Sequence, residues 1–125
     1  MYTGSSYGVD IESIARVGRA LERSGESFLK RIFTDAERGH GNDASFLATR
    51  FAAKEAFFKA LGTGLSGGVR WHDFELPFKE RYPLGPVVSG RSKELLAGRR
   101  VLVSVSHTSR VAVAVVFLEG SGGLP

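Results

Sequence analysis

The sequence predicts an α+β fold: a single compact domain, residues 1–125, in which a mostly antiparallel sheet packs on one long helix. Three observations predict this class. A stretch rich in Ala, Leu, Lys and Glu runs from Phe46 to Leu61 without glycine or proline, long enough for about four turns of helix. Two apolar segments, 101–106 and 111–118, are separated by four residues and predict a hairpin. The composition, 42% hydrophobic and 24% charged over 125 residues, is typical of one globular domain.

The N-terminal segment predicts a strand that leads into an amphipathic helix. Residues 6–11 alternate weakly and predict a short strand that delivers Asp10 to the start of a helix. From 12 to 23 the apolar residues fall on one helical face, and Ser24-Gly25 predicts the end of this helix. Another face carries three arginines, here called the arginine stripe: Arg16, Arg19 and Arg23.

Short elements are predicted through the rest of the chain. An apolar patch at 28–33 precedes Thr34 and Glu37, whose spacing is that of a capping box at the start of a brief helix. A polar loop at 39–43 then leads into the long helix. After that helix we expect a strand over 69–78, a Pro/Gly turn over 82–86, a strand at 87–88, a helix over 91–97, the hairpin, and a tail over 120–125.

The composition excludes several classes of protein. The chain contains no cysteine, which excludes a disulfide scaffold, a thiolate zinc site and a cysteine nucleophile, and fits a reducing cytoplasm. The first 20 residues do not resemble a secretory signal, and the longest apolar run, 111–118, is too short to span a membrane. We therefore expect a cytoplasmic protein without a membrane partner. The net charge of +4, with 12 arginines among 17 basic residues, predicts an acidic partner.

Three charged residues are candidates for catalysis. Glu55 and Lys59 are four apart on the long helix and so lie on one face, where they form either an exposed ion pair or part of a cleft. Asp10 either caps the following helix or binds a cation. Because Mg²⁺ uses carboxylates from distant segments together with water and phosphate oxygens, Asp10 and Glu55 are candidate metal ligands. Lys59 beside them would place a positive charge against a pyrophosphate, and the trio fits phosphoryl transfer.

The hairpin tip and the glycines after the long helix are candidate anion sites. His107 and Thr108 offer hydrogen-bond donors at a strand end, where they can hold a phosphate; the alternative is a solvated loop histidine. The backbone N–H groups of Gly62 and Gly64 can face an anion or simply cap the helix. The arginine stripe forms either a solvated face or a docking surface for an acidic helix.

Two segments of the chain resemble the signature segments of a known family. GVDIESIARV, which contains Asp10, and RFAAKEAFFKALGTG, which contains Glu55 and Lys59, are similar to those of the holo-acyl-carrier-protein synthases, the small bacterial 4′-phosphopantetheinyl transferases. The resemblance continues through FLKRIFTDAE, through residues 69–76 and through the closing hairpin VSVSHTSRVAVAVVFLE. It therefore covers almost the whole chain.

The resemblance implies the 4′-phosphopantetheinyl transferase fold and a specific reaction. The phosphopantetheine arm of coenzyme A would be transferred to a serine of an apo acyl carrier protein, with release of adenosine 3′,5′-bisphosphate. Mg²⁺ would be the cofactor, bound by Asp10 and Glu55 beside the coenzyme A pyrophosphate, which Lys59 would neutralise. The base that takes the serine proton would be Glu55 or a water molecule on the metal. Members of this family commonly form trimers with active sites between subunits, so the resemblance also implies a homotrimer.

The resemblance implies roles for residues outside this trio as well. His107 would help to hold the nucleotide end of coenzyme A, and Arg50 and Thr108 would contact phosphates. Carrier proteins are acidic helical bundles, so the arginine stripe would dock the carrier, and Arg16 matches the docking arginine of the family. The chain departs from the family at Leu84-Gly85-Pro86, which lacks the basic residue that usually stands between Gly and Pro. Contacts to coenzyme A at that position stay open.

Two other functions fit part of the sequence. A small basic nucleic-acid-binding domain would interleave aromatic and basic residues on strands, whereas the aromatic residues here cluster on the long helix and the net charge is mild. A scaffold without catalysis would not need Asp10, Glu55, Lys59 and His107 together. We therefore expect an enzyme that does not bind nucleic acid. The sequence does not identify which carrier protein it modifies.

Overall fold

The computed structural model describes residues 4–38, 43–77 and 85–120. The elements, in chain order, are β1 (Ser6–Ser13), α1 (Ile14–Ile32), α2 (Asp35–Arg38), α3 (Ala44–Leu61), the 3₁₀ turn η1 (Trp71–Asp73), β2 (Phe74–Glu75), β3 (Val87–Val88), α4 (Gly90–Leu96), β4 (Arg100–His107) and β5 (Val111–Glu119).

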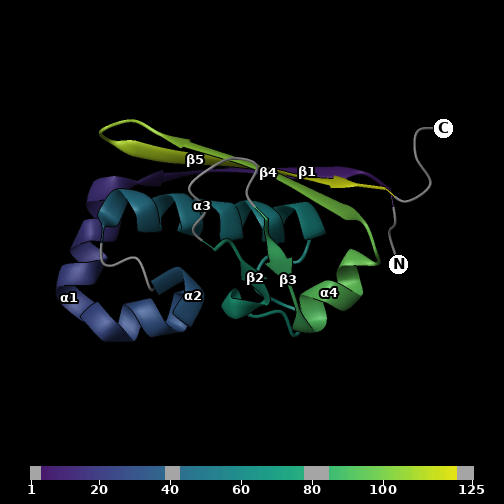
Figure 1. The fold of residues 1–125 in the computed structure, drawn as a ribbon, viewed down its shortest axis with the longest axis horizontal. Coiled ribbons are helices and arrows are strands. Elements are labelled where there is room, and N and C mark those ends of the chain that lie inside the picture. Colours follow the sequence, from purple (N-terminus) through teal and green to yellow (C-terminus); the bar gives the residue numbers. More distant parts are fainter. Residues whose placement is uncertain (1–3, 39–42, 78–84, 121–125) are drawn as a thin grey trace.

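A three-stranded antiparallel sheet in the order β1-β5-β4 forms one layer of the molecule. The long helix α3 runs along one face of this sheet, and the other helices lie on the far side of α3 (Figure 1). β2 and β3 pair with each other in a separate two-stranded sheet. The predicted α+β class, with an antiparallel sheet on a long helix, is confirmed.

The helix and the sheet pack closely because α3 presents small side chains to the strands. Its buried alanines share a core with the inward-facing residues of β5, and the members of this core include Ala52, Ala56, Ala60, Ala114, Val116 and Leu118. At Gly8 of β1 the two backbones almost touch, since a Cβ there would lie 2.0 Å from the carbonyl oxygen of Ala56. This approach places the β1 side chains that follow Gly8 directly beside α3.

The first strand is longer than predicted. β1 continues to Ser13 instead of ending at Ile11, because Glu12 and Ser13 still pair with residues of β5. The helix therefore begins at Ile14, and the Ser13 side chain accepts a hydrogen bond from the backbone N–H of Arg16 at 3.2 Å. Long-range pairing decides this boundary, and short-range periodicity does not reveal it.

The predicted break at Ser24-Gly25 is present as a kink with non-helical backbone at Gly25, but a second helical stretch follows it directly. α1 passes through Gly25 with a kink, where φ is 43° and ψ is −119°, and continues to Ile32. Three residues of the predicted apolar patch, Leu29, Ile32 and Phe33, are at most 4% exposed and pack with residues of α3. Burial of this patch holds the second half of the helix in place, and glycine accepts the left-handed φ at the kink without a steric penalty.

The prediction of a strand over 69–78 was largely wrong. Only Phe74–Glu75 is a strand, Trp71–Asp73 is a 3₁₀ turn, and residue 78 lies outside the described residues. Buried side chains from other elements bind this backbone: Lys54 donates to the carbonyl oxygens of Trp71 and Phe74. Hydrogen bonds of this kind replace the ladder that a strand would form.

The remaining element predictions are confirmed where the structure describes them. The long helix, the capping box, the strand at 87–88, the helix near 91–97 and the hairpin are all present. The predicted turn over 82–86 and the tail over 120–125 lie mostly outside the described residues, as does most of the loop over 39–43. Among the described residues, no helix has both the length and the apolar character needed to cross a membrane.

Candidate active site

The three residues predicted for catalysis come together where β1 meets α3. Asp10 lies on β1, two residues after Gly8 and on the same strand face, while Glu55 and Lys59 lie one turn apart on α3. The Lys59 Nζ donates to Asp10 Oδ1 at 2.8 Å and to the carbonyl oxygen of Val9 at 3.1 Å. Lys59 thus forms its ion pair across elements, with Asp10, and not along the helix with Glu55.

A fourth residue, Glu12, belongs to this cluster and was missed in the sequence. It follows Asp10 by two positions on β1, so both side chains lie on the strand face that meets α3. The prediction placed Glu12 in the helix and therefore on an unrelated face. The alternation of the strand, if continued past Ile11, was the signal that would have found it. We call Asp10, Glu12, Glu55 and Lys59 the acidic cluster.

Crowding of carboxyl groups shifts the acid–base properties of the cluster. Burial, a hydrogen bond with Asp10 and the nearby charges of Asp10 and Glu55 raise the pKa of Glu12 to about 7. Burial and the charge of Asp10 raise the pKa of Glu55, while Lys59 partly opposes this. The hydrogen bond to Asp10 raises the pKa of Lys59, so this side chain stays positively charged. A positive charge bound among these carboxylates would therefore stabilise their ionised forms.

The hydrogen bonding of the carboxylates leaves room for a divalent cation. Asp10 Oδ2 is buried and accepts no hydrogen bond from the described part of the protein. A hydrogen bond between the Asp10 and Glu12 carboxyl groups requires a proton on one of them. In the described residues, no group of three or more His, Cys, Asp or Glu side chains is already arranged to hold a metal ion. Mg²⁺ needs only one or two carboxylates, because water and phosphate oxygens complete its coordination. Asp10 and Glu55 are thus suitable ligands.

A separate cavity of about 290 Å³ contains two of the other predicted residues. It lies between the first half of α3 and the end of β4, and we call it the α3–β4 cavity. Its lining consists of Asp43, Ser45, Phe46, Thr49, Arg50, Val105, Ser106 and His107. Arg50 and His107 thus share one cavity, although they are 57 positions apart in the sequence.

This cavity and the acidic cluster lie on opposite sides of α3. Lys59 follows Arg50 by nine residues, which is about two and a half helical turns, so the two side chains point in opposite directions from the helix axis. Asp10 lies on β1 and His107 on β4, at the two edges of the sheet. One chain therefore presents two separate polar regions, one with carboxylates and a lysine and one with an arginine and a histidine.

Thr108, Gly62 and Gly64 have local partners. The Thr108 hydroxyl accepts hydrogen bonds from the backbone N–H groups of Arg110 and Val111, each at 3.1 Å, within the hairpin turn. The N–H groups of Gly62 and Gly64 both donate to the carbonyl oxygen of Phe58. Gly62 has a left-handed φ of 83° and ends α3, so these glycines act as a helix cap in this structure.

The arginine stripe is divided by the packing of α1. Arg16 and Arg23 line a groove of about 160 Å³, which we call the α1 groove, whereas Arg19 is exposed outside its lining. The other lining residues are Glu12, Val17, Ala20, Phe28 and Phe51. The groove thus combines two guanidinium groups with an apolar floor, and Glu12 connects it to the acidic cluster.

The largest of these three cavities, about 450 Å³, includes none of the predicted site residues. It is lined by Lys30, Arg31, Leu65, Val69, Arg70, Trp71 and His72. Size alone therefore does not locate the residues suited to chemistry in this chain.

Taken together, the arrangement suits a reaction on an anionic substrate. The acidic cluster provides a carboxylate with a raised pKa, a lysine and ligands for a cation, and these groups can move a proton and stabilise developing charge. The α3–β4 cavity provides an arginine and a histidine for a phosphate. The α1 groove provides a surface for an acidic partner next to the cluster.

Known proteins are similar to this chain in sequence and in fold. The family model described as the 4′-phosphopantetheinyl transferase superfamily matches residues 6–114. A holo-[acyl-carrier-protein] synthase of Koribacter versatilis is 44% identical over 119 residues, covering 90% of this chain and 95% of that protein. The corresponding protein of Vibrio cholerae is 43% identical over 119 residues, with 90% and 94% covered.

Solved structures give the same result. A holo-(acyl-carrier-protein) synthase from Bacillus anthracis in complex with CoA (3′,5′-ADP) matches with a TM-score of 0.76 and 34% identity, covering 93% of this chain and 96% of that one. The Helicobacter pylori holo-[acyl-carrier-protein] synthase in complex with coenzyme A matches with a TM-score of 0.80 and 29% identity, covering 90% and 99%. The chain belongs to the 4′-phosphopantetheinyl transferase superfamily and, within it, to the family of the holo-acyl-carrier-protein synthases.

Proposed function

We propose that this chain transfers the 4′-phosphopantetheine arm of coenzyme A to a serine of an apo acyl carrier protein and releases adenosine 3′,5′-bisphosphate. The observation that carries the proposal is the acidic cluster, in which Asp10 of β1 meets Glu55 and Lys59 of α3. The same signature segments support it, and so do the solved relatives with coenzyme A bound.

In this reaction the serine hydroxyl oxygen of the carrier attacks the β-phosphorus of coenzyme A. A new P–O bond forms to the serine, and the bond from that phosphorus to the bridging oxygen of the pyrophosphate breaks, so that the oxygen leaves with the nucleotide. Glu55 is the base that accepts the serine proton, since it is a carboxylate of α3 that lies beside Asp10 and Lys59. Lys59 stabilises the negative charge on the leaving oxygen.

Mg²⁺ is the proposed cofactor, held by Asp10 and Glu55. Bound there, it would polarise a phosphoryl oxygen and neutralise charge on the pyrophosphate. The buried, unpartnered Oδ2 of Asp10 supports this assignment. The charges of Asp10 and Glu55 help to raise the pKa of Glu12 to about 7, and the same concentration of negative charge favours a bound cation.

The nucleotide end of coenzyme A binds in the α3–β4 cavity, where Arg50 and His107 hold a phosphate. Because this cavity and the acidic cluster lie on opposite sides of α3, we propose that one complete site uses the acidic cluster of one copy and the α3–β4 cavity of another. The roles of Thr108, Gly62 and Gly64 toward phosphate are weaker proposals, since their polar groups already have partners.

We also propose a homotrimer, which would bring such half-sites together. The sheet face opposite α3 is bare of helices (Figure 1), and it is apolar along adjacent strands. Exposed large side chains on this face include Tyr7 at 71%, Val9 at 45%, Ile11 at 64%, Leu102 at 39% and Val115 at 42%. Contiguous exposed apolar side chains of this kind mark an interaction surface.

The α1 groove is the proposed docking site for the carrier. Arg16 and Arg23 would face acidic side chains of the carrier helix, and the apolar floor at Phe28 and Phe51 would receive an apolar side chain. The groove adjoins Glu12, so a carrier bound there would lie close to the acidic cluster. Arg19, outside the lining, would steer the encounter more than it would hold the complex.

Intact-protein mass spectrometry tests the proposal. An apo acyl carrier protein is incubated with this chain and coenzyme A, in Mg²⁺ and in chelator. We expect the carrier to gain the mass of one phosphopantetheine only when Mg²⁺ is present. The Glu55→Gln variant should fold and lose the activity, whereas Glu75→Gln, a change at another half-buried glutamate outside the site, should keep it. No mass gain with several carriers would contradict the proposed reaction.

A further inference from the structure

Among the ion pairs of the described residues that the proposed mechanism does not use, one is fully buried. Glu37 of α2 and Lys54 of α3 are both 0% exposed, and Lys54 Nζ donates to Glu37 Oε1 at 2.8 Å. Removing two charges from water is unfavourable unless geometry and further hydrogen bonds compensate. The pair therefore requires partners, and these partners connect it to the proposed nucleotide site.

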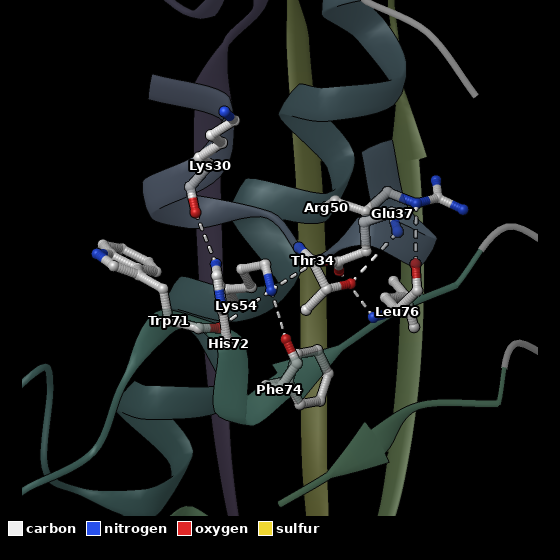
Figure 2. A network of polar contacts seen from close by, with 9 residues as sticks. All are labelled: Lys30, Thr34, Glu37, Arg50, Lys54, Trp71, His72, Phe74 and Leu76. Atoms are coloured by element: carbon white, nitrogen blue, oxygen red, sulfur yellow. Dashed lines mark hydrogen bonds and ion pairs between the residues drawn. The ribbon is translucent and has the colours of Figure 1, made fainter. Parts of the chain in front are cut away.

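The second carboxylate oxygen of Glu37 binds the backbone that leads to Arg50. Glu37 Oε2 accepts a hydrogen bond from the N–H of Leu76 at 2.8 Å. The carbonyl oxygen of the same residue, Leu76, accepts a hydrogen bond from Arg50 Nε at 3.4 Å. Figure 2 shows this chain of contacts from Glu37 through Leu76 to the Arg50 side chain.

Lys54 holds the same backbone from the other side. Its ammonium group donates to the carbonyl oxygens of Trp71, at 3.1 Å, and Phe74. The segment from Trp71 to Leu76 is therefore attached to α3 through Lys54 and to α2 through Glu37 (Figure 2). Both attachments fix the position of the Leu76 carbonyl relative to α3.

The Arg50 guanidinium has two further supports in the α3–β4 cavity. It lies 3.8 Å from the centre of the Phe46 ring, and its Nη1 donates to Thr49 Oγ1 at 3.0 Å. Arg50 is itself 7% exposed. Phe46 and Thr49 belong to α3 along with Arg50, whereas Leu76 ties the guanidinium to a different segment of the chain.

We infer that Glu37 is a positioning residue for anion binding: through Leu76 it orients Arg50 in the α3–β4 cavity and so sets the affinity for the nucleotide phosphates. This inference rests on the proposed function, in which Arg50 binds coenzyme A. Glu37 itself, wholly buried, does not touch the substrate. Lys54 contributes to this positioning, because it binds Oε1 of the Glu37 carboxylate and leaves Oε2 to accept the hydrogen bond from Leu76.

The experiment is a double-mutant cycle on ligand affinity. Binding of adenosine 3′,5′-bisphosphate to the full chain is measured by isothermal titration calorimetry for wild type, Arg50→Ala, Glu37→Gln and the double variant. Arg50→Ala should weaken binding roughly 10- to 100-fold, the value of one or two charge-assisted hydrogen bonds. Glu37→Gln should weaken it about three- to tenfold. In the Arg50→Ala background Glu37→Gln should have no further effect beyond about twofold.

A second variant separates positioning from general damage to the core. Lys54→Met removes the hydrogen bonds to the carbonyl oxygens of Trp71 and Phe74, so it should also weaken binding, by about three- to tenfold. In the Arg50→Ala background Lys54→Met should have no further effect beyond about twofold. Ser92→Ala, which removes the buried hydrogen bond to Asp73, should lower stability and leave affinity unchanged.

The outcomes distinguish this inference from the proposed function. If Arg50→Ala does not weaken binding, the assignment of Arg50 to the nucleotide site is wrong. If Arg50→Ala weakens binding but Glu37→Gln does not, or if the two losses add independently, the positioning role is wrong while the function stands. If Lys54→Met weakens binding as much in the Arg50→Ala background as in wild type, the pair supports the core alone.

Discussion

Replacing Gly8 by alanine tests the close packing of β1 on α3 that forms the acidic cluster. An alanine Cβ at this position would lie 2.0 Å from the Ala56 carbonyl oxygen and 2.9 Å from the Ala60 backbone nitrogen. Both atoms belong to the backbone of one helix, so no side-chain rotation can relieve the contact. The strand and the helix must separate.

The size of the separation follows from the distances. Ordinary van der Waals contact begins at 3.4 Å, so relief of the 2.0 Å contact with Ala56 requires a displacement of about 1.4 Å. Inserting a methyl group into a packed core costs about 1–3 kcal/mol, and a purely backbone contact belongs at the upper end. We expect a loss of about 3 kcal/mol and a fall in Tm of roughly 10 °C for a domain of this size.

The same displacement damages the active site. Lys59 reaches Asp10 Oδ1 at 2.8 Å and the Val9 carbonyl at 3.1 Å across the contact that Gly8 permits. A separation of more than 1 Å would lengthen these bonds beyond hydrogen-bonding distance. Transfer activity should therefore fall even at a temperature where the variant remains folded.

Urea denaturation and the mass-spectrometric transfer assay check both effects. Gly18→Ala is the matched control, because a Cβ at Gly18 has its nearest neighbour, the Ala44 Cβ, at 3.9 Å. Within a helix this change should stabilise the chain by about 0.5–1 kcal/mol. Wild-type stability in Gly8→Ala would refute the packing argument. Reduced stability with full activity at low temperature would refute its connection to the site.

Three further predictions concern other surfaces. Arg16→Glu should raise the KM for the carrier more than Arg19→Glu, because Arg16 lines the α1 groove and Arg19 does not. Steady-state kinetics at two salt concentrations measures both variants, and equal effects would contradict the proposed docking site. Ile11→Asp should dissociate the assembly in sedimentation velocity while the chain remains folded, since Ile11 is 64% exposed; an unchanged mass would argue against the proposed trimer surface. The metal-free chain should lose stability as pH rises from about 5 to about 7. The pKa of Glu12 is about 7 in the folded state and 4.5 in the unfolded state, so the folded chain holds a proton over this range that the unfolded chain has released. Glu12→Gln should flatten this slope in urea denaturation, and identical slopes would disprove it.

Much of the candidate site was predictable because its signals are local. Glu55 and Lys59 lie on a helix whose length and composition are evident in the sequence, and helical spacing alone places them on one face. The capping box of Thr34 and Glu37 formed as its spacing indicated. Asp10 joined them in prediction because it stood at the junction of a predicted strand and helix, where a carboxylate either caps the helix or binds a cation.

Other features depended on contacts between distant segments, which no local pattern reveals. Glu12 stayed on β1 because β5 pairs with it from the other end of the chain. Helix α1 resumes after Gly25 because its second half is buried against α3. The segment after Val69 forms only a short strand, and Lys54 of α3 binds its backbone carbonyl groups.

The fold class, the long helix and three members of the acidic cluster, Asp10, Glu55 and Lys59, could be predicted from the sequence, since helix propensity, hydrophobic periodicity and side-chain chemistry are properties of neighbouring residues. Three features became visible only in the folded chain: Arg50 and His107 lie across α3 from Lys59, Lys54 and Glu37 are wholly buried together, and the outer sheet face is apolar and exposed. The reason is that the direction and the burial of a side chain are set when strands and helices pack, through contacts between separate segments of the chain.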